Sequence, residues 1–424
     1  MRKYSEYKNS NIPWIGDIPS HWNVQRGKNV LTLLDRPVLD TDDVITCFRD
    51  GEVTLRKNRR EEGFTVSFQE IGYQGIEPGD LVVHGMDGFA GAIGVSDSRG
   101  KATPVLNVMD SIHNKRFLMY YLRTAAYKDV FMSLSTGIRV RSCDLRWNKL
   151  SVFPFVLPER EEQDRIAEYI DNKLQQINNM IAEAKASIEE YKAWKASIIY
   201  EAVTKGLDSN VEMKNSGVRW IGEMPTSWSR TKLSNCFNTI GSGTTPTSDD
   251  DSYYGGEINW LQSGDINGGY VYETKKKITN EAYSAFSALK IYSAPFLAIA
   301  MYGASIANTS IVSIDACTNQ ACCVFSDANE LVEMGFVFFA VLAAKEELLL
   351  SARGGTQPNI NQDVLKKLMI PIPSKKEQQN IAKYLIDKCT AIQELINDKE
   401  ILVEDLDAYK KSLVFEVVTG KRKV

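Results

Sequence analysis

The sequence contains an internal repeat, which constrains its fold more than any other feature. The segment Trp14–Trp22 (WIGDIPSHW) recurs as Trp220–Trp228 (WIGEMPTSW), 206 residues later. A second pair, Pro158–Tyr169 and Pro373–Tyr384, shares the pattern Pro-x₄-Gln-x-x-Ile-Ala-x-Tyr at an offset of 215. The offset is constant within each pair of motifs and increases by nine residues between the Trp motifs and the helix starts. The chain therefore alternates blocks of fixed length, which carry the motifs, with blocks of variable length.

The repeat divides the 424 residues into six segments. Fixed segments carry the repeated motifs, and the two intervening blocks are each long enough for one domain. The expected boundaries are an N-terminal conserved segment 1–22, a first variable domain 23–157, a central conserved helix 158–206, a linker with the repeated Trp motif 207–228, a second variable domain 229–372 and a C-terminal conserved helix 373–424.

The fixed blocks are predicted to be long helices. No proline or glycine occurs from 159 to 205, and apolar residues recur at spacings of three and four. This seam, typical of a coiled coil, comprises Ile170, Leu174, Ile177, Ile181, Ala184, Ile188, Tyr191 and Ile198, and 215 residues later Leu385, Cys389, Ile392, Ile396, Lys399, Val403, Leu406 and Leu413. About 46 residues would span ~70 Å. The connectivity favours antiparallel pairing, with one variable domain at each end and the C-terminus near Trp14–Trp22.

Further apolar residues lie off the two seams. They are Trp194, Ile199 and Val203 in the first helix and Leu395, Ile401, Leu402, Phe415 and Val418 in the second. Helices of a partner protein would bury such a surface. Packing against the chain's own variable domains is the alternative, and the sequence does not choose between the two.

Each variable block is predicted to be a mixed α/β domain, so the fold class is α/β (mixed α+β). Apolar runs at Leu81–Val83 and Phe296–Ala300 indicate strands, and Arg116–Lys128 and Gly335–Leu350 indicate helices. Their similar size suggests one fold with diverged surfaces.

Composition and motifs favour a binding protein over an enzyme. The longest apolar run has eleven residues, from Met334 to Ala344, too short to span a membrane, and the polar N-terminus lacks the apolar core of a secretory signal. Seven scattered cysteines suggest reduced core thiols in a cytoplasmic protein. The chain has no phosphate-binding loop, dinucleotide fingerprint or nucleophile elbow, and its three histidines lack spaced partners. We therefore expect no catalytic residue, no metal site and no cofactor of its own.

The net charge of −4 excludes a uniformly basic surface. The first variable domain carries 18 Lys and Arg against 16 Asp and Glu, and the second 10 against 14. Clustered cations and loops rich in Asn, Gln, Thr and Tyr are nevertheless the chemistry that reads DNA. The DNA-binding candidates are Arg56, Lys57, Arg59, Arg60, Arg139, Arg141 and Arg146 in the first domain, and Thr244, Thr245, Tyr302, Gln357 and Asn359 in the second.

Taken together, the duplicated motifs, Gly-Ser-Gly-Thr-Thr-Pro at 241–246 and Gly-Gly-Thr-Gln-Pro-Asn-Ile at 354–360 resemble those of the DNA-specificity subunit of type I restriction-modification systems. The resemblance covers the whole chain. It implies two target-recognition domains, an antiparallel coiled coil and a non-catalytic role. Its implied partners are double-stranded DNA, two methyltransferase (modification) subunits and restriction (translocase) subunits, which would bring S-adenosylmethionine, ATP and magnesium. The first variable domain departs from the family pattern, because Ser-Thr-Gly-Ile-Arg at 135–139 replaces the Gly-Thr-Gln-Pro loop.

Two functional hypotheses remain at this stage. In the first, each domain reads one half of a bipartite, asymmetric DNA site and the helices set the spacing. In the second, the chain is a coiled-coil scaffold whose two heads bind protein or carbohydrate.

Overall fold

The computed structural model describes residues 2–59, 71–133, 145–248, 250–352 and 359–424. The chain forms two compact units, which are described one at a time. Unit 1 contains residues 1–185 and 400–424, and unit 2 contains residues 186–399. Among the described residues, no helix is both long and apolar enough to cross a membrane.

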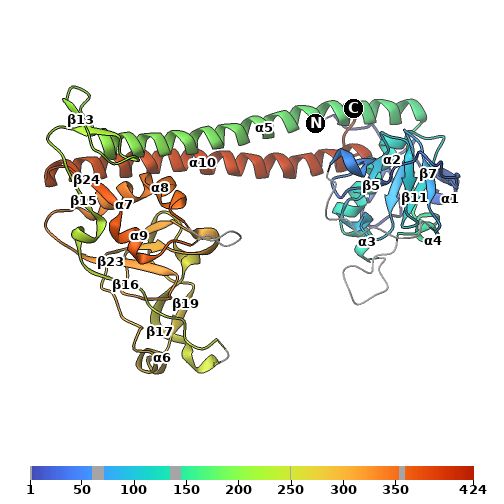
Figure 1. The fold of residues 1–424 in the computed structure, drawn as a ribbon. Helices are drawn as coiled ribbons and strands as arrows, with labels where there is room; N and C mark the ends of the chain where they lie inside the picture. Colours follow the sequence, from blue (N-terminus) through green and yellow to red (C-terminus); the bar gives the residue numbers. More distant parts are fainter. Residues whose placement is uncertain (1, 60–70, 134–144, 249, 353–358) are drawn as a thin grey trace. The chain divides into compact units, whose positions relative to one another are not determined.

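Two long helices, α5 (Arg160–Lys205) and α10 (Lys375–Val418), each contribute to both units (Figure 1). In unit 1 the first part of α5 shares a core with the last part of α10, where Ile170 and Ile177 join Leu413. In unit 2 the order is reversed, and Ile188 in the second half of α5 packs with Ile392 in the first half of α10. Antiparallel pairing is therefore confirmed by the contacts inside each unit.

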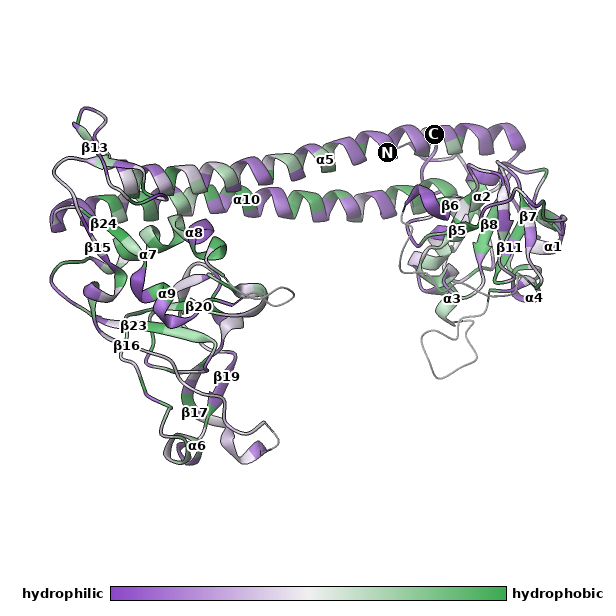
Figure 2. Cartoon of the chain, viewed as in Figure 1, coloured by the Kyte–Doolittle hydropathy of each residue, from purple (hydrophilic) through white to green (hydrophobic). Residues whose placement is uncertain are grey.

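The predicted seam is the buried side of these helices. Ile170 and Leu385 are fully buried, and Ile181 is only 8% exposed. Polar residues follow its margin, where Lys195 Nζ donates a hydrogen bond to Gln393 Oε1 (3.1 Å). Figure 2 shows the resulting alternation of hydrophobic and hydrophilic residues along both helices.

The apolar residues off the seam divide between the two alternatives. Ile199, Val203 and Val418 are buried in the core of their own unit. The others keep 38–57% of their surface exposed, and they are Trp194, Leu395, Ile401 and Leu402. Phe415 is half-buried, with the Lys128 ammonium 4.8 Å from its ring centroid.

The head of unit 1 is built on a four-stranded antiparallel sheet of order β4-β11-β8-β9. Its strands are β4 (Thr32–Leu33), β8 (Leu81–His84), β9 (Ile93–Val95) and β11 (Leu106–Asp110). Helix α2 (Lys115–Tyr127) packs on the sheet through Phe117 and Leu118. The remaining elements are β3 (Asn23–Arg26) paired with β12 (Pro154–Leu157), β5 (Ile45–Cys47) with β6 (Val53–Leu55), β7 (Gln74–Ile76) with β10 (Gly100–Ala102), and the helices α1 (Gly27–Val30), η1 (Arg56–Asn58), η2 (Gly88–Ala90), α3 (Val130–Ser133) and α4 (Trp147–Leu150).

The head of unit 2 repeats this sheet with one more strand, in the order β16-β23-β20-β21-β18. The strands are β16 (Phe237–Gly241), β18 (Tyr270–Val271), β20 (Phe296–Ala300), β21 (Thr309–Val312) and β23 (Cys322–Ala328). A second sheet of order β19-β17-β22 comprises β17 (Tyr254–Leu261), β19 (Lys276–Ile278) and β22 (Cys317–Thr318). The other elements are β15 (Ser229–Lys232) paired with β24 (Met369–Ile372), and the helices η4 (Leu233–Cys236), η5 (Asp251–Tyr253), η6 (Ser263–Asp265), α6 (Asn280–Ala285), η7 (Gly303–Ser305), α7 (Met334–Ala343), α8 (Lys345–Leu350) and α9 (Gln362–Lys367).

The two heads share one fold at the level of single hydrogen bonds. Strand order β4-β11-β8-β9 in unit 1 matches β16-β23-β20-β21 in unit 2. After the central strand, Gly85 N donates to Val105 O (2.8 Å) in unit 1, as Met301 N donates to Ala321 O (2.8 Å) in unit 2. The predicted repeat of one fold is therefore confirmed, and it relates position 85 to position 301.

The predicted strand Phe296–Ala300 has the same ends as β20, and the predicted strand Leu81–Val83 and helix Arg116–Lys128 differ from β8 and α2 by one residue at their ends. The predicted helix Gly335–Leu350 is wrong in one respect, because it is two helices, α7 and α8. They are interrupted at Ala344, whose φ of −81° and ψ of 4° depart from helical geometry. No proline or glycine marks this break, so the sequence pattern could not reveal it.

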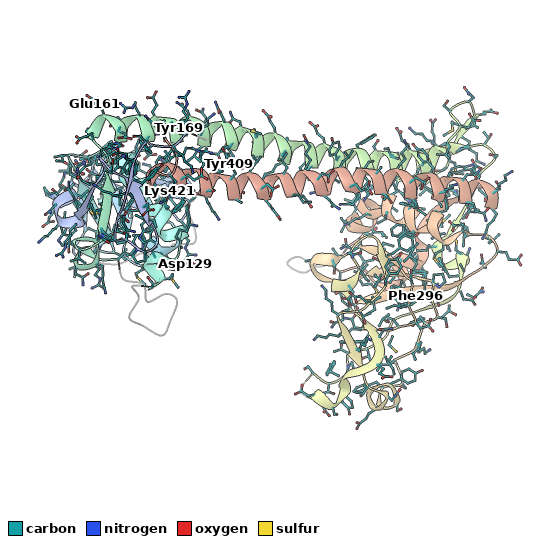
Figure 3. All side chains as sticks on the ribbon, turned by 180° about the vertical axis from the view of Figure 1, so that it is seen from behind. Asp129, Glu161, Tyr169, Phe296, Tyr409 and Lys421 are labelled. Atoms are coloured by element: carbon teal, nitrogen blue, oxygen red, sulfur yellow. The ribbon has the colours of Figure 1, made fainter. Side chains whose placement is uncertain are left out.

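The repeated Trp motif is a short hairpin in each unit. Strands β1 (Tyr7–Asn9) and β2 (Asp17–Pro19) pair in unit 1, and β13 (Met213–Asn215) and β14 (Glu223–Pro225) pair with the same register in unit 2. Gly16 and Gly222 take positive φ values of 74° and 66° in the connecting turns, which explains the repeated glycine. In unit 1 the motif also meets the C-terminus, because Lys421 Nζ donates to Asp17 O and Lys423 N donates to Arg2 O (3.0 Å). Figure 3 labels Lys421, together with Tyr409 on α10 and Tyr169 on α5, and the next residue, Arg422, donates from Nη1 to the Tyr409 hydroxyl (3.4 Å).

The second repeated motif fixes each long helix to its own head through a glutamine. Gln378 Nε2 donates to Pro373 O (3.0 Å) and to Leu331 O (2.9 Å), and its Oε1 accepts from Glu333 N (2.8 Å). Gln163 does the same in unit 1, with Pro158 O at 2.8 Å and Asn114 N at 2.9 Å. Both glutamines are fully buried. A buried side chain that satisfies backbone groups at two elements explains why this residue is repeated.

The described cysteines lie in the core. Six of the seven are buried and make no disulfide, and Cys143 lies outside the described residues. Burial raises the pKa of both Cys322 and Cys323 to about 12, so their thiols stay protonated at neutral pH.

Candidate nucleic-acid interface

Several of the candidate residues lie where the central strand of each sheet ends. In unit 1 this strand is β8, which ends at His84, and in unit 2 it is β20, which ends at Ala300. Neighbouring strands begin at the same edge, so their connecting loops meet there. Loops on a rigid sheet are the usual place for recognition residues.

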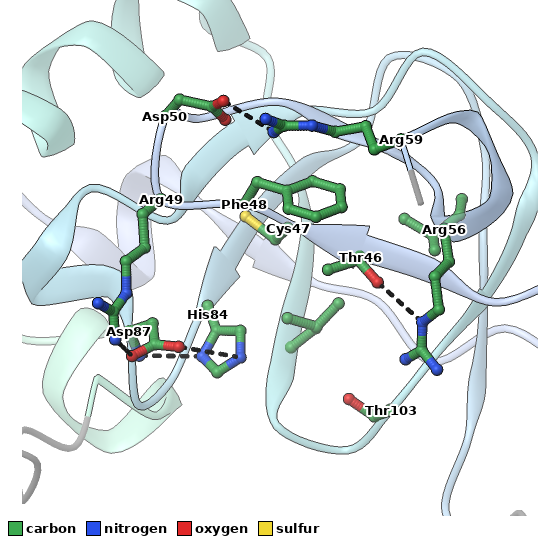
Figure 4. A pocket seen from close by; sticks show the side chains of 12 residues that line it. Thr46, Cys47, Phe48, Arg49, Asp50, Arg56, Arg59, His84, Asp87 and Thr103 are labelled. Carbon is green, nitrogen blue, oxygen red and sulfur yellow. Dashed lines mark hydrogen bonds and ion pairs between the residues drawn. The ribbon is translucent and has the colours of Figure 1, made fainter. Parts of the chain in front are cut away.

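In unit 1 this edge borders a pocket with a volume of about 510 Å³ (Figure 4). Three arginines line it, Arg49, Arg56 and Arg59, together with His84 and Asp87. Threonine hydroxyls at 46 and 103 add hydrogen-bonding groups. The pocket therefore offers both donors and acceptors around a basic rim.

Arg59 is held against an aromatic ring and two carboxylates. Its guanidinium carbon lies 4.2 Å from the centroid of the Phe48 ring. Nη1 is 2.7 Å from Asp50 Oδ2 and 3.3 Å from Glu52 Oε2. On the other wall, Arg49 Nη2 is 2.9 Å from Asp87 Oδ1. These ion pairs orient the two arginines at the rim and also reduce the net charge of the pocket.

His84 is an uncharged part of the pocket. Burial lowers its pKa, so the ring is neutral at neutral pH. Its Nδ1 accepts hydrogen bonds from Met86 N (3.2 Å) and Asp87 N (2.9 Å). Because Nδ1 accepts, the proton resides on Nε2, which is 4.0 Å from Asp87 Oδ2.

The structure brings together part of the predicted set in unit 1. Arg56 and Arg59 line the pocket, whereas Lys57 lies outside it and pairs with Asp43 at 2.5 Å. Arg146 follows Leu145, whose N–H donates to Gly85 O (2.8 Å) directly after His84. Three predicted residues lie outside the described residues, namely Arg60, Arg139 and Arg141.

In unit 2 side-chain hydrogen bonds join the loops at the end of β20. Gln362 Nε2 donates to Ser242 Oγ (3.0 Å), and Thr245 Oγ1 donates to Gln320 Oε1 (2.7 Å). Tyr302 forms an isolated antiparallel bridge with Asn359. The segments 242–245, 319–320, 302 and 359–362 thus lie at one edge of the sheet, although they are far apart in the sequence.

The Gly-Ser-Gly-Thr-Thr-Pro loop is fixed by close backbone contacts. A side chain at Gly243 would lie 1.8 Å from Thr318 O, so only glycine fits there. Trp260 Nε1 donates to Thr244 O (3.3 Å) from the second sheet. Thr244 and Thr245 therefore lie in a loop whose backbone is held by these contacts. Gln357 lies outside the part of the chain that the structure describes.

The three lysines Lys275, Lys276 and Lys277 line a separate pocket with Tyr254. Lys276 Nζ lies 5.9 Å from the centroid of the Tyr254 ring. This basic patch belongs to the second sheet and adjoins the Gly-Ser-Gly-Thr-Thr-Pro loop, because the Tyr254 hydroxyl donates to Pro246 O (2.8 Å).

Several residues at these edges were not among the sequence candidates. They are Thr46, Arg49, His84, Asp87 and Thr103 in unit 1 and Ser242 and Gln362 in unit 2. The sequence position of Arg49 could have indicated a role, because Arg49 follows a short strand and precedes the Arg56–Arg59 cluster by a few residues. Arginine, threonine, asparagine and glutamine side chains are suited to hydrogen bonding with base edges and phosphates. Within the described ranges, no group of three His, Cys, Asp or Glu side chains is placed to hold a metal ion.

A family model and several known proteins match this chain, and all of them are type I restriction-modification specificity proteins or domains. A family model described as the type I restriction modification DNA specificity domain matches residues 225–404. The putative type I restriction enzyme MjaX specificity subunit of Methanocaldococcus jannaschii is 24% identical, and the match covers 99% of this chain and 98% of that protein. The type I restriction enzyme EcoBI specificity subunit of Escherichia coli is 26% identical over 78% of this chain and 72% of its own length.

Two solved structures share the fold. A chain from a structure described as the basis of complex assembly and conformational transition of the type I R-M system has a TM-score of 0.73 at 13% identity, covering 95% of this chain and 98% of its own. The HsdS subunit from Thermoanaerobacter tengcongensis has a TM-score of 0.56 at 14% identity, covering 96% and 98%.

Proposed function

We propose that this chain is the sequence-specific DNA-binding subunit of a type I restriction-modification enzyme, as the family model and the relatives that it matches indicate. The observation that carries the proposal is that two heads of one fold present different polar groups at the same edge of the sheet. Equivalent scaffolds with different side chains suit the reading of two different DNA sequences.

We propose that each head reads one half of a bipartite, asymmetric site. In the first half-site, Arg56, Arg59 and Arg146 from the predicted set, with Arg49, would contact guanine edges or phosphates. In the second, Thr244, Thr245, Tyr302 and Asn359 would make neutral hydrogen bonds. The expected domain boundaries, 23–157 and 229–372, are proposed as the limits of the two target-recognition domains.

The remaining sequence candidates stay part of this proposal. Lys57 would contact phosphate from outside the unit 1 pocket. Arg60, Arg139, Arg141 and Gln357 are proposed as further contacts on the strength of their sequence positions alone.

We propose that the chain binds two methyltransferase (modification) subunits and, in the larger assembly, restriction (translocase) subunits. The exposed apolar residues of the long helices are a suitable surface, because Trp194 is 50% and Ile401 57% exposed. Those partners would supply S-adenosylmethionine, ATP and magnesium, so this subunit is proposed to be non-catalytic. The cytoplasmic location expected from the sequence stays a prediction.

Mapping modified adenines tests the proposed function. DNA would be taken from cells that express this chain with a methyltransferase subunit, and from cells that express the methyltransferase alone. We expect modification at one bipartite sequence only when both are present. A protein- or carbohydrate-binding scaffold predicts the same modification pattern in the two samples.

A further inference from the structure

Each unit contains a cleft between its head and its long helices, and the two clefts occupy equivalent positions. The unit 1 cleft is lined by α2 residues, including Arg123 and Tyr127, and by Lys410, Lys411 and Val414 of α10. The unit 2 cleft is lined by Lys192, Lys195 and Ile199 of α5, and by residues of α7 and α8 that include Leu342 and Lys345.

The internal repeat relates the helix residues of one cleft to those of the other. The offset of 215 relates Lys195 to Lys410 and Ile199 to Val414. It also relates Ala196 to Lys411. The unit 2 cleft is the larger, about 670 Å³ against 230 Å³, in keeping with its smaller Ala196. One half-buried lysine is therefore kept at the same place in both clefts although the residues around it differ.

Both clefts are basic within an acidic chain. The unit 1 cleft has three cations, Arg123, Lys410 and Lys411, against the two carboxylates of Asp50 and Asp407. Asp407 Oδ1 is 3.3 Å from the half-buried Lys410 Nζ, and because Asp407 itself is exposed, this pair contributes little to stability.

The unit 2 cleft has a similar balance of charge. Its cations are Lys192, Lys195 and Lys345, and its carboxylate is that of Glu346. The whole chain, by contrast, has a net charge of −4. A local excess of positive charge in both clefts favours a negatively charged ligand.

Each cleft also adjoins the candidate interface of its own head. In unit 1, Asp50 lines both the cleft and the arginine pocket, where it accepts from Arg59. In unit 2, Lys345 Nζ donates to Asn308 Oδ1 (2.9 Å), in the loop between β20 and β21. Gly268 of a neighbouring loop lines the cleft. A duplex held by the loops would therefore have a basic surface beside it in both units.

From these contacts we infer that the two clefts bind the DNA backbone, with Lys195 and Lys410 as the shared phosphate contacts. The inference rests on the proposed function and extends it, because it assigns to the repeated helices a role in holding DNA as well as in supporting the heads. Phosphate contacts position a protein on the duplex without selecting sequence. The expected signature is a change in affinity and salt dependence with the same sequence preference.

The test uses the complex of this chain with its methyltransferase subunit and a duplex that carries the mapped site. Binding is measured by fluorescence anisotropy across a salt series, for the double variant Lys195→Gln with Lys410→Gln. Loss of two phosphate contacts should reduce the slope of log K against log salt by about 1.8, and affinity by roughly 60-fold at about 0.1 M salt. A duplex with a scrambled site should lose affinity by the same factor.

The repeat supplies a matched control. Lys173 and Lys388 are also related by the offset of 215, lie on the same two helices and line neither cleft. The variant Lys173→Gln with Lys388→Gln should keep the wild-type slope. A second pair within the clefts, Arg123→Gln with Lys345→Gln, should reduce the slope as the first pair does.

Three results would overturn the inference. The first is a slope in both cleft variants equal to that of the control. The second is loss of co-elution with the methyltransferase on gel filtration, which would make the clefts protein-docking sites. The third is a wild-type complex that does not distinguish the mapped duplex from the scrambled one, and this result alone would also remove the proposed function.

Discussion

Replacing Gln378 with methionine should destabilise unit 2 strongly, because this side chain is fully buried and uses its amide for three hydrogen bonds. Methionine has a similar length but no donor or acceptor of comparable strength. The change would leave the N–H of Glu333 and the carbonyls of Leu331 and Pro373 without this partner. A buried group left unsatisfied costs about 1–3 kcal/mol. The contact with Pro373 O is buried, whereas those with Leu331 O and Glu333 N are part-buried and water can replace them in part, so we expect a loss of about 2–4 kcal/mol.

Urea denaturation followed by far-UV circular dichroism and tryptophan fluorescence measures this loss. With a slope of about 2–3 kcal/mol per molar urea, the midpoint of the affected transition should fall by about 1–2 M. Trp228 is a local reporter, since its Nε1 donates to Glu377 Oε2 (3.1 Å) beside the substituted residue. The matched control is Gln379→Met on the exposed side of the same helix. If both variants unfold at the same urea concentration, the glutamine does not anchor the helix as described.

Further predictions concern the helices and the ion pairs. Ile396→Asp places a charge in the buried seam beside Ile188 and should lower the melting temperature by several degrees in calorimetry; an unchanged melting profile would show that the seam is not required. Arg99 donates to the Asp42 carboxylate through Nε (3.0 Å) and Nη2 (3.2 Å). Arg99→Met should therefore lower the free energy of unfolding by about 2–3 kcal/mol. This is less than the roughly 3–5 kcal/mol of a fully buried pair, because the Arg99 side chain is 34% exposed. Burial raises the pKa of the Asp42 carboxyl, but hydrogen bonds from Arg99 and the Leu39 N–H outweigh it, so the pKa is below its usual range. The stability that this ion pair contributes is present above about pH 4 and is lost as the pH falls through the lowered pKa of Asp42. In chemical denaturation, the difference in unfolding free energy between wild type and Arg99→Met should therefore shrink in acid. A difference that stays constant with pH would contradict this prediction. Inserting one heptad into each long helix adds ~10 Å, about three base pairs, and should alter or abolish the tolerated spacer in methylation mapping, whereas a retained spacer would show that the helices do not set it.

The repeat explains why so much of the fold was readable from the sequence. An uninterrupted period of three and four residues without proline or glycine specifies a helix whatever it packs against, and α5 runs from Arg160 to Lys205 as expected. Antiparallel pairing followed from connectivity alone. The break between α7 and α8 at Ala344 was not readable, because an apolar helix buried on all sides has no periodic signal to lose.

The candidate site was less predictable because its geometry is non-local. Ser242 and Gln362 share a hydrogen bond across 120 residues, and only the sheet topology brings them together. Charge clusters in the sequence also conceal their counterions. Lys57 looked like part of one basic patch with Arg59, yet Asp43 pairs with it outside the pocket. Residue type indicated the chemistry of recognition, whereas its location required the tertiary fold.

Exchanging one head while keeping the other tests most directly whether the two heads read separate half-sites. Residues 23–157 would be replaced by the corresponding domain of a specificity subunit with a different known site, and modified adenines would be mapped genome-wide with the same methyltransferase. We expect that one half of the modified sequence changes to that of the donor while the other half is retained. A modified sequence that stays the same, or that changes in both halves, would contradict it.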